Sequence, residues 1–427
     1  MNSLIRSQRF PHSVPPKNVR RVVVRPRRRR VCLWQRLRNW TKKWGQPPFF
    51  VVRKVLGPIA MLAVLCFSSF VHAQTVRVAV LQDIPKFSLS IEGSYQIFPM
   101  YSAELLAEGG SLHEVSVTGT PAGIQLGDQE LPVFGITLRL HDHRQGLITL
   151  NGRHFRGGMD IYRQKDQTLL IINHLDIEDY LQGVLYHEVS HRWPIEVLKA
   201  QAVAARTYAI YQTTVSVSKD FDLTSDAFSQ VYGGAASEKK RTNKAVADTR
   251  GEILIWDGKV FPPYFHATCG GHTLSSRELW SMDVPPLQGV RCPYCVDSPY
   301  FYWKVTITKE EAIQKFKKAG YPLKDIDAIE VSRTDPSGRA LDLILVHPQG
   351  EMQLSANVFR LILGPNQIRS AFFTVEIQDR QIVFRGRGWG HGVVLCQWGA
   401  YGMARQGKKM EQILAHYYPG AQVVRLE

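Results

Sequence analysis

The sequence predicts an α+β fold with a strand-rich N-terminal part, a central helical pair and a mixed β/α C-terminal part. Strand patterns gather in residues 75–175, where runs such as TVRVAVLQ and TLLIINHL are rich in aliphatic and β-branched residues. Residues 176–214 carry a helical pattern instead. Because strands and helices are segregated along the chain, the order favours α+β over a regularly alternating α/β sheet.

The net charge of the chain is confined to its first residues. The 427 residues include 53 Lys and Arg against 37 Asp and Glu, a net charge of +16. Residues 1–54 hold sixteen of these bases and no acid, so we expect a basic, disordered leader. Residues 55–427 carry 37 bases and 37 acids, so the net positive charge that would suggest nucleic-acid binding is absent from them. With 44% hydrophobic and 21% charged residues, the whole is neither a disordered chain nor a membrane bundle.

Residues 55–73 form an apolar run that follows Arg53 and Lys54. Val71-His72-Ala73 resembles a signal-peptidase site with cleavage before Gln74, while the run is also long enough for an uncleaved membrane anchor. Both alternatives place residues 74–427 outside the membrane, in the periplasm or cell wall or anchored to the membrane surface.

We divide this exported region by pattern into four parts. They are a β-rich part (74–175), a core (176–300), a β/α insert (301–375) with a helix at 309–318, and a Gly-rich loop with a C-terminal helix (376–427).

A glutamate lies on the apolar stripe of the first predicted helix. Asp176 is a good N-cap, and the stripe recurs at three- and four-residue spacing through Ile177, Tyr180, Leu181, Val184 and Leu185. Glu188 is the next residue on it. An acid on such a stripe is expected to lose solvation, which raises its pKa toward the range of a general acid. The alternative is a helix-end glutamate that reaches solvent.

The second helix begins at Pro194 and carries Arg206 near its core face among small alanines. Arg206 could pair with Glu188, bind an anionic group of a substrate or form a structural ion pair.

Residues 187–191 read His-Glu-Val-Ser-His, which matches the helix motif of zinc peptidases. That chemistry needs both histidines on one face of a continuous helix. Trp193-Pro194 disfavours helix just after the motif, so a zinc peptidase is the weaker hypothesis.

Several long motifs resemble one known family. They are DYLQGVLYHEVSHRWPIEVLKAQAVAARTYAIYQ (179–212), SDAFSQVYGG (225–234), YFHATCGGHT (264–273) and GRGWGHGVVLCQWGAYGMARQGK (386–408). In this order they closely resemble the stage II sporulation protein D (SpoIID) family, which includes lytic transglycosylases and amidase enhancers. The resemblance covers essentially residues 75–427.

The resemblance implies cleavage of peptidoglycan glycan strands, with Glu188 as the single acid/base and without a catalytic cofactor. A lytic transglycosylase needs one carboxylate, because the C6 hydroxyl of the same N-acetylmuramic acid is the nucleophile. The other reading is a glycan-binding protein that stimulates an amidase without cutting. Either way we expect peptidoglycan, and an amidase or another cell-wall enzyme, as partners.

For substrate contacts the resemblance points to Arg206, and Asp226 is the candidate partner if water attacks instead. The Gly-rich loop adds Trp389 as a sugar platform, with His391 and Gln397 beside it. We expect Tyr208 and Gln230 to line the substrate site as well.

Three cysteines cluster in the sequence near a histidine. His266, Cys269, Cys292 and Cys295 would make a structural zinc set, in which the last two form a CxxC pair. A disulfide between two of these cysteines is equally natural in an exported protein.

Overall fold

The computed structural model describes residues 74–426 except 143–144, 217, 219 and 227–228. The predictions for the basic leader and for the apolar run at 55–73 fall outside these residues. Among the helices that the structure describes, none is both long and apolar enough to cross a membrane.

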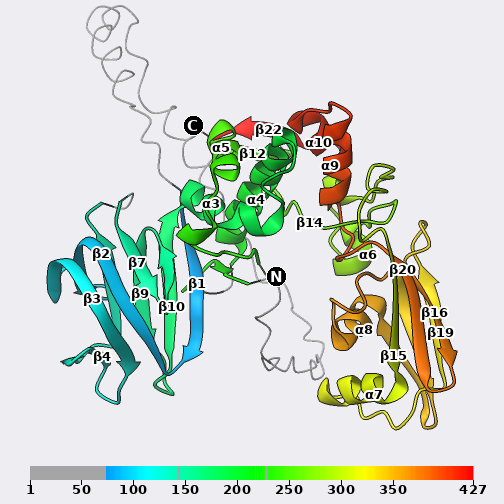
Figure 1. Cartoon of the computed structure of the whole chain (residues 1–427), viewed down its shortest axis with the longest axis horizontal. Helices are drawn as coiled ribbons and strands as arrows, with labels where there is room; N and C mark the ends of the chain where they lie inside the picture. The colour runs from blue at the N-terminus through cyan, green and yellow to red at the C-terminus, as the bar shows by residue number, and fades with distance from the viewer. Residues whose placement is uncertain (1–73, 143–144, 217, 219, 227–228, 427) are drawn as a thin grey trace, which may run out of the picture. The chain divides into compact units, whose positions relative to one another are not determined.

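The N-terminal part is a mainly antiparallel sheet, drawn blue to green in Figure 1. Its strands follow the order β11-β1-β10-β9-β6-β2-β3-β4-β5, and β7 joins β2 to β8. Their bounds are β1 Thr75–Ile84, β2 Lys86–Pro99, β3 Ala107–Gly119, β4 Ile124–Leu126, β5 Gln129–Leu131, β6 Gly135–Leu140, β7 Leu147–Leu150, β8 Arg153–Phe155, β9 Gly158–Arg163, β10 Leu169–Asp176 and β11 Leu223–Thr224. The strand-rich prediction for residues 74–175 is confirmed.

Strand β10 passes directly into the central helices. Its first five residues are all buried, as expected for a strand covered on both faces. The side chain of Asp176 accepts a hydrogen bond from Glu178 N and caps helix α3 (Ile177–Glu188). Helix α3 therefore starts at a fixed point at the end of strand β10.

The central part is built around helix α4 (Ile195–Val215), most of whose residues are buried. It contacts α3, α5 (Lys240–Asp248), α9 (Gln397–Arg405) and α10 (Met410–Tyr417). Small residues such as Ala202, Ala205 and Ala209 are fully buried in its core and let neighbouring elements approach closely. A three-stranded sheet covers the same helix, formed by β13 (Lys259–Val260), β12 (Glu252–Trp256) and β22 (Gln422–Arg425).

A third part has its own apolar core, separate from the other two. One sheet has the order β15 (Tyr302–Thr308), β20 (Gln381–Arg387), β19 (Phe373–Gln378); the other has the order β16 (Ala328–Thr334), β17 (Ala340–His347), β18 (Gly350–Ser355). Helices α7 (Lys309–Lys318) and α8 (Ala356–Leu363) complete it. Because β20 pairs along its whole length with β15, this part extends to residue 387 and not 375 as predicted.

The molecule thus combines a strand-rich N-terminal part, packed helices and a mixed C-terminal part. The α+β class predicted from the segregation of patterns is confirmed.

Candidate active site

Glu188 is the last residue of α3, and the chain turns away immediately after it. Val189 is extended, with φ −137° and ψ 151°, and its N–H donates to Leu185 O. The backbone of Glu188 therefore lies between a helix on one side and an extended segment on the other.

The carboxyl group of Glu188 is poorly solvated. Its Oε1 accepts a hydrogen bond of 3.3 Å from Val231 N, the one hydrogen bond recorded for it among the described residues. Burial raises its pKa to about 7, and the Val231 N–H opposes the rise only partly. This agrees with the expectation from the apolar stripe, and it makes the group able to give and take a proton near neutral pH.

Glu188 opens into a cavity of about 430 Å³, which we call the Glu188 pocket. Residues from six separated segments meet here, and an acid, hydroxyls, an imidazole and aromatic rings are all present. The described residues that line it are Glu188, Tyr208, Ser229, Val231, Tyr264, Phe265, Trp280 and His391.

One wall of the pocket is aromatic. The rings of Tyr264 and Trp280 lie with centroids 4.3 Å apart, and Trp280 lies 5.2 Å from the imidazole of His391. Trp280 ends helix α6 (Ser276–Trp280) and keeps 39% of its surface exposed. An exposed indole at the rim of a pocket is a ready stacking surface for an apolar sugar face.

His391 is fixed as a neutral donor to the backbone. Its Nε2 lies 2.9 Å from Phe265 O, and its Nδ1 accepts from Val393 N at 3.0 Å, so the proton is on Nε2. Burial lowers its pKa to about 4, which keeps it uncharged near neutral pH. With both ring nitrogens engaged, His391 shapes the pocket and does not supply a second acid.

Arg206 does not reach the pocket, which corrects the prediction that it binds substrate. Its side chain is fully buried, and Nε and Nη2 donate to the two carboxylate oxygens of Glu178 at 2.9 and 2.7 Å. Nη1 also donates to Glu252 O at 3.0 Å. Because its N–H groups are occupied by these bonds, the guanidinium joins α3, α4 and β12 and forms a structural ion pair with Glu178. A structural ion pair was one of the three roles that the sequence left open for Arg206.

Gln230 is also an internal residue rather than a substrate contact. It is 1% exposed, its Oε1 accepts from the Tyr180 hydroxyl at 3.0 Å, and its Nε2 donates to Ala205 O at 3.4 Å. These bonds tie the segment that carries Val231 to α3 and α4. Gln230 thereby helps to position the N–H that contacts Glu188.

Two residues of the C-terminal motif lie elsewhere, and both corrections have a packing cause. Gln397 is buried at the start of α9, and its Nε2 donates to Gln201 Oε1 at 3.4 Å. Trp389 stands edge-on against Tyr300 at 4.5 Å with the guanidinium of Arg369 over its ring. Neither belongs to the described lining of the Glu188 pocket.

Asp226 is exposed, and its Oδ1 accepts from the Thr224 hydroxyl at 2.8 Å. It is absent from the described lining of the pocket, whereas Tyr208 and His391 are present in it as predicted. Tyr264 and Trp280 were not predicted as site residues. Tyr264 stands in the YFHATCGGHT motif, which could have indicated it, but no pattern marked Trp280.

The His-Glu-Val-Ser-His motif does not form a zinc-peptidase site. Helix α3 ends at Glu188, so His187 and His191 do not share a helical face. His187 Nε2 instead lies 2.6 Å from the Ser237 hydroxyl. In the described part of the chain, these residues do not appear in any group of metal-ligand side chains.

Comparisons with known proteins identify the family of the chain. The model of the stage II sporulation protein family, SpoIID, matches residues 165–256, which include α3, α4 and Glu188. A protein of Brachyspira hyodysenteriae with no assigned function is 34% identical over 83% of this chain and 94% of its own length. The chain belongs to the SpoIID family.

Other SpoIID-family relatives have names that refer to activity. The amidase enhancer of Bacillus subtilis is 28% identical over 74% of this chain, which spans 50% of that longer protein. Stage II sporulation protein D of the same species is 29% identical over 62% of this chain and 78% of its own length. A domain family of unknown function, DUF8618, matches residues 295–394, which contain the third part of the fold.

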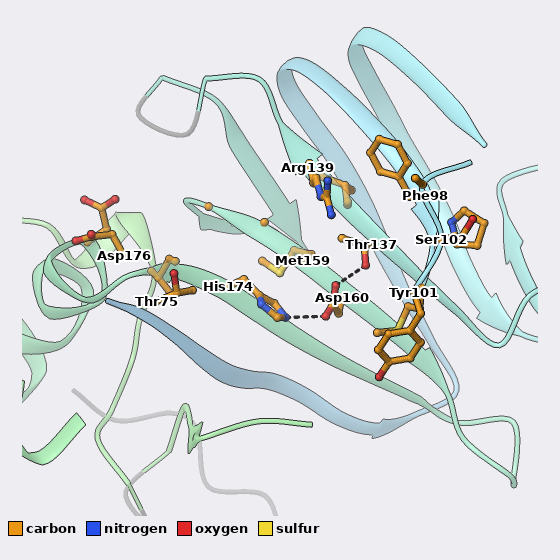
Figure 2. Close-up of a pocket in the computed structure, with 18 residues that line it drawn as sticks. Thr75, Phe98, Tyr101, Ser102, Thr137, Arg139, Met159, Asp160, His174 and Asp176 are labelled. Atoms are coloured by element: carbon orange, nitrogen blue, oxygen red, sulfur yellow. Dashed lines mark hydrogen bonds and ion pairs between the residues drawn. The ribbon is translucent and has the colours of Figure 1, made fainter. Parts of the chain in front are cut away.

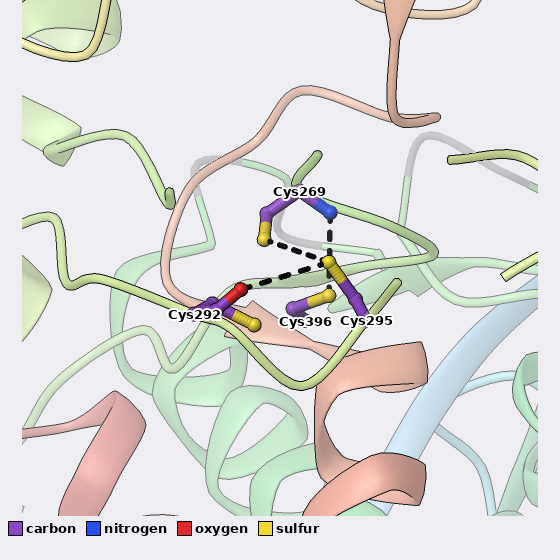
Figure 3. A group of neighbouring side chains, drawn as sticks. All are labelled: Cys269, Cys292, Cys295 and Cys396. Atoms are coloured by element: carbon purple, nitrogen blue, oxygen red, sulfur yellow. Dashed lines mark hydrogen bonds between the residues drawn. The ribbon is translucent and has the colours of Figure 1, made fainter. Parts of the chain in front are cut away.

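This SpoIID-family chain also contains a buried group of four cysteines, here called the cysteine cluster (Figure 3). Their ligand atoms all lie within 4.8 Å of one another, and the members are Cys269, Cys292, Cys295 and Cys396. The fourth member is Cys396, where the sequence predicted His266. The imidazole of His266 instead has its Nδ1 3.1 Å from Val393 O.

A larger cavity of about 850 Å³ lies on the N-terminal sheet (Figure 2). Its central acid, Asp160, has one oxygen 2.7 Å from His174 Nε2 and the other 2.8 Å from the Thr137 hydroxyl. With both oxygens occupied, this carboxylate is a poor general acid. The Glu188 pocket differs from this cavity in holding a carboxyl whose pKa is raised into the range of a general acid.

Proposed function

We propose that the protein is an exported lytic transglycosylase that cleaves the glycan strands of peptidoglycan. Membership in the SpoIID family supports a role in the cell wall. The observation that carries the finer proposal is a single poorly solvated carboxyl, with its pKa raised to about 7, inside an aromatic-walled pocket.

In the proposed reaction Glu188 acts twice. The neutral acid first gives its proton to the glycosidic oxygen between N-acetylmuramic acid and N-acetylglucosamine, and the bond from that oxygen to the anomeric carbon breaks. The carboxylate then takes the proton of the C6 hydroxyl of the same N-acetylmuramic acid. That oxygen bonds to the anomeric carbon, which leaves a 1,6-anhydro end and returns Glu188 to its acid form.

The pocket supports an internal nucleophile over attack by water. Hydrolysis of a glycoside ordinarily uses two carboxylates, one on each side of the bond. Glu188 is the one carboxylate in the described lining, and Asp226 is not part of it. An attacking hydroxyl on the substrate itself has a high effective concentration, so that a second acid is unnecessary.

The aromatic wall supports a sugar substrate. Trp280 and Tyr264 offer flat apolar faces in the pocket that contains Glu188. Tyr208 and Ser229, which carry hydroxyl groups, line the same pocket. Stacking on apolar rings with a few polar contacts suits a neutral glycan backbone.

A second candidate function comes from the match to a protein named amidase enhancer. In that case the same pocket would bind glycan, and the protein would stimulate an amidase without cutting the strand. This alternative predicts that the Glu188 carboxyl is dispensable for the biological effect.

The two functions separate with purified glycan strands and three forms of the protein. We expect the unchanged protein and the exposed-surface control Glu376→Gln to shorten the strands, and Glu188→Gln to bind them without cutting. Size distribution after digestion measures cleavage, and co-sedimentation with insoluble peptidoglycan measures binding. Equal cutting by Glu188→Gln would refute the assignment, whereas binding without cutting by all three forms would favour the enhancer.

A further inference from the structure

The cysteine cluster brings together three segments that are distant in the sequence. Cys269 follows strand β14 (Phe265–His266), Cys292 and Cys295 lie in one loop, and Cys396 ends strand β21 (Leu395–Cys396). All four are at most 1% exposed and none forms a disulfide. Residues 257–294 and 395–427 lie outside both family models, so three of the four positions belong to neither match.

The spacing of the sulfur atoms fits one tetrahedral metal ion. Zinc binds thiolate sulfur at about 2.3 Å, which places the four sulfurs about 3.8 Å apart. In the cluster every pair lies within 4.8 Å, and Sγ of Cys269 is 3.5 Å from Sγ of Cys295. Figure 3 shows the four side chains converging on one region.

Backbone N–H groups are aimed at the sulfur of Cys396. The N–H of Cys269 and the N–H of Gly399 both donate to it at 3.2 Å. The Tyr417 hydroxyl lies 3.1 Å from Sγ of Cys292. Donors around the sulfurs stabilise the thiolate form, which is the form that binds a metal.

A buried cation next to the cluster gives an independent observation. Arg339 is fully buried, and its Nη2 donates to Cys269 O at 2.7 Å and His272 O at 3.2 Å. Its Nε and Nη1 have no hydrogen-bond partner among the described residues. A buried guanidinium needs a compensating negative charge. Four thiolates around one divalent ion carry a net double negative charge, and Arg339 lies within electrostatic reach of Cys269 and Cys396 as well as of the carboxylate of Asp335.

We propose that Cys269, Cys292, Cys295 and Cys396 bind one zinc ion that fixes the wall of the Glu188 pocket. A tetrahedral set of four thiolates is typical of zinc or of an iron–sulfur centre, and four protein ligands around one zinc ion make a structural rather than a catalytic site. Strand β14 pairs with β21 through Phe265 with Leu395 and His266 with Cys396. Phe265 lines the pocket and its carbonyl accepts from His391, so the ion holds the strand on which that wall is built.

The first test is metal analysis of the full chain purified without chelators. We expect one zinc per chain, and four cysteines that resist alkylation until the protein is denatured in chelator. Replacement of zinc by Co²⁺ should give the visible absorption of a tetrahedral ion together with thiolate-to-cobalt charge transfer. Cysteines of the cluster joined by disulfides, or iron in place of zinc, would overturn the proposal. This result is independent of whether the protein cuts glycan.

Two variants test which residues are the ligands. Cys396→Ser should lower zinc to less than about a tenth per chain or bind it much more weakly, and should lower the melting temperature. His266→Asn changes the nearby imidazole but no thiol, and should keep one zinc per chain. Loss of zinc from His266→Asn with retention in Cys396→Ser would refute the four-cysteine set. If Cys396→Ser does not fold, the Co²⁺ spectrum of the unchanged protein decides.

Discussion

Replacing Glu188 by glutamine should stabilise the protein at alkaline pH while it removes activity. The pKa of this carboxyl is about 7 in the folded protein and 4.5 in an unperturbed glutamate. A folded-state pKa above the unfolded value contributes stability that is complete below about pH 4.5 and is lost as the pH rises through about 7. The difference between the two pKa values corresponds to about 3 kcal/mol in the free energy of unfolding, because one pKa unit, a tenfold change in the protonation equilibrium, corresponds to about 1.4 kcal/mol. Because Glu188 keeps some solvent access, this figure is an upper bound.

The assay is denaturant unfolding of the unchanged protein, Glu188→Gln and the exposed control Glu376→Gln at about pH 5 and about pH 8. Glutamine has no proton to lose in this range and can still accept the hydrogen bond from Val231 N. We expect Glu188→Gln to gain up to about 2.5 kcal/mol over the unchanged protein between the two pH values, and the control to gain nothing. Equal pH dependence in all three proteins would refute the desolvation of Glu188, on which its proposed role as an acid depends.

Three further predictions concern the pocket and its support. The rate of cleavage should be high below about pH 7 and fall as the pH rises through that value, because the first step needs the protonated form of Glu188. A pH–rate profile in which the rate rises with pH would contradict this. Arg206→Met should lower the free energy of unfolding by about 3–5 kcal/mol, because it leaves the buried carboxylate of Glu178 without its partner. The double variant with Glu178→Leu should recover part of that loss and keep its cleavage activity. A stable but inactive double variant would restore Arg206 to substrate binding. Trp280→Ala should weaken binding to glycan strands about fivefold or more, as measured by co-sedimentation. The control Tyr302→Ala removes an exposed ring outside the Glu188 pocket and should leave binding unchanged. Equal binding by both variants would exclude the stacking role of Trp280.

Local patterns predicted the elements of the fold well. The Asp176 cap, the stripe that ends at Glu188 and the helix at residues 309–318 all depend on spacing within a few residues, and the structure has them at those places. The boundary of the third part was missed because it depends on pairing of β20 with β15, which is about seventy residues distant in the sequence. No local pattern records that partner.

The same distinction explains the site. The burial of Glu188 could be predicted because the apolar stripe that indicates it lies on the same helix. The role of Arg206 was predicted wrongly because its partner Glu178 lies on a different helix. The local sequence pattern of a buried arginine is the same whether the arginine pairs with a carboxylate or binds a ligand. Cys396 was missed as a cluster member because it is about a hundred residues beyond Cys295 and enters through the pairing of β21 with β14.

The central claim is that a hydroxyl of the substrate, rather than water, completes the reaction at Glu188. The direct measurement is mass spectrometry of glycan fragments made in water labelled with a heavy oxygen isotope. The account predicts 1,6-anhydro ends, each lighter by one water than a reducing end, with no label incorporated by the cut. Reducing ends that carry the heavy isotope would show hydrolysis and contradict the account.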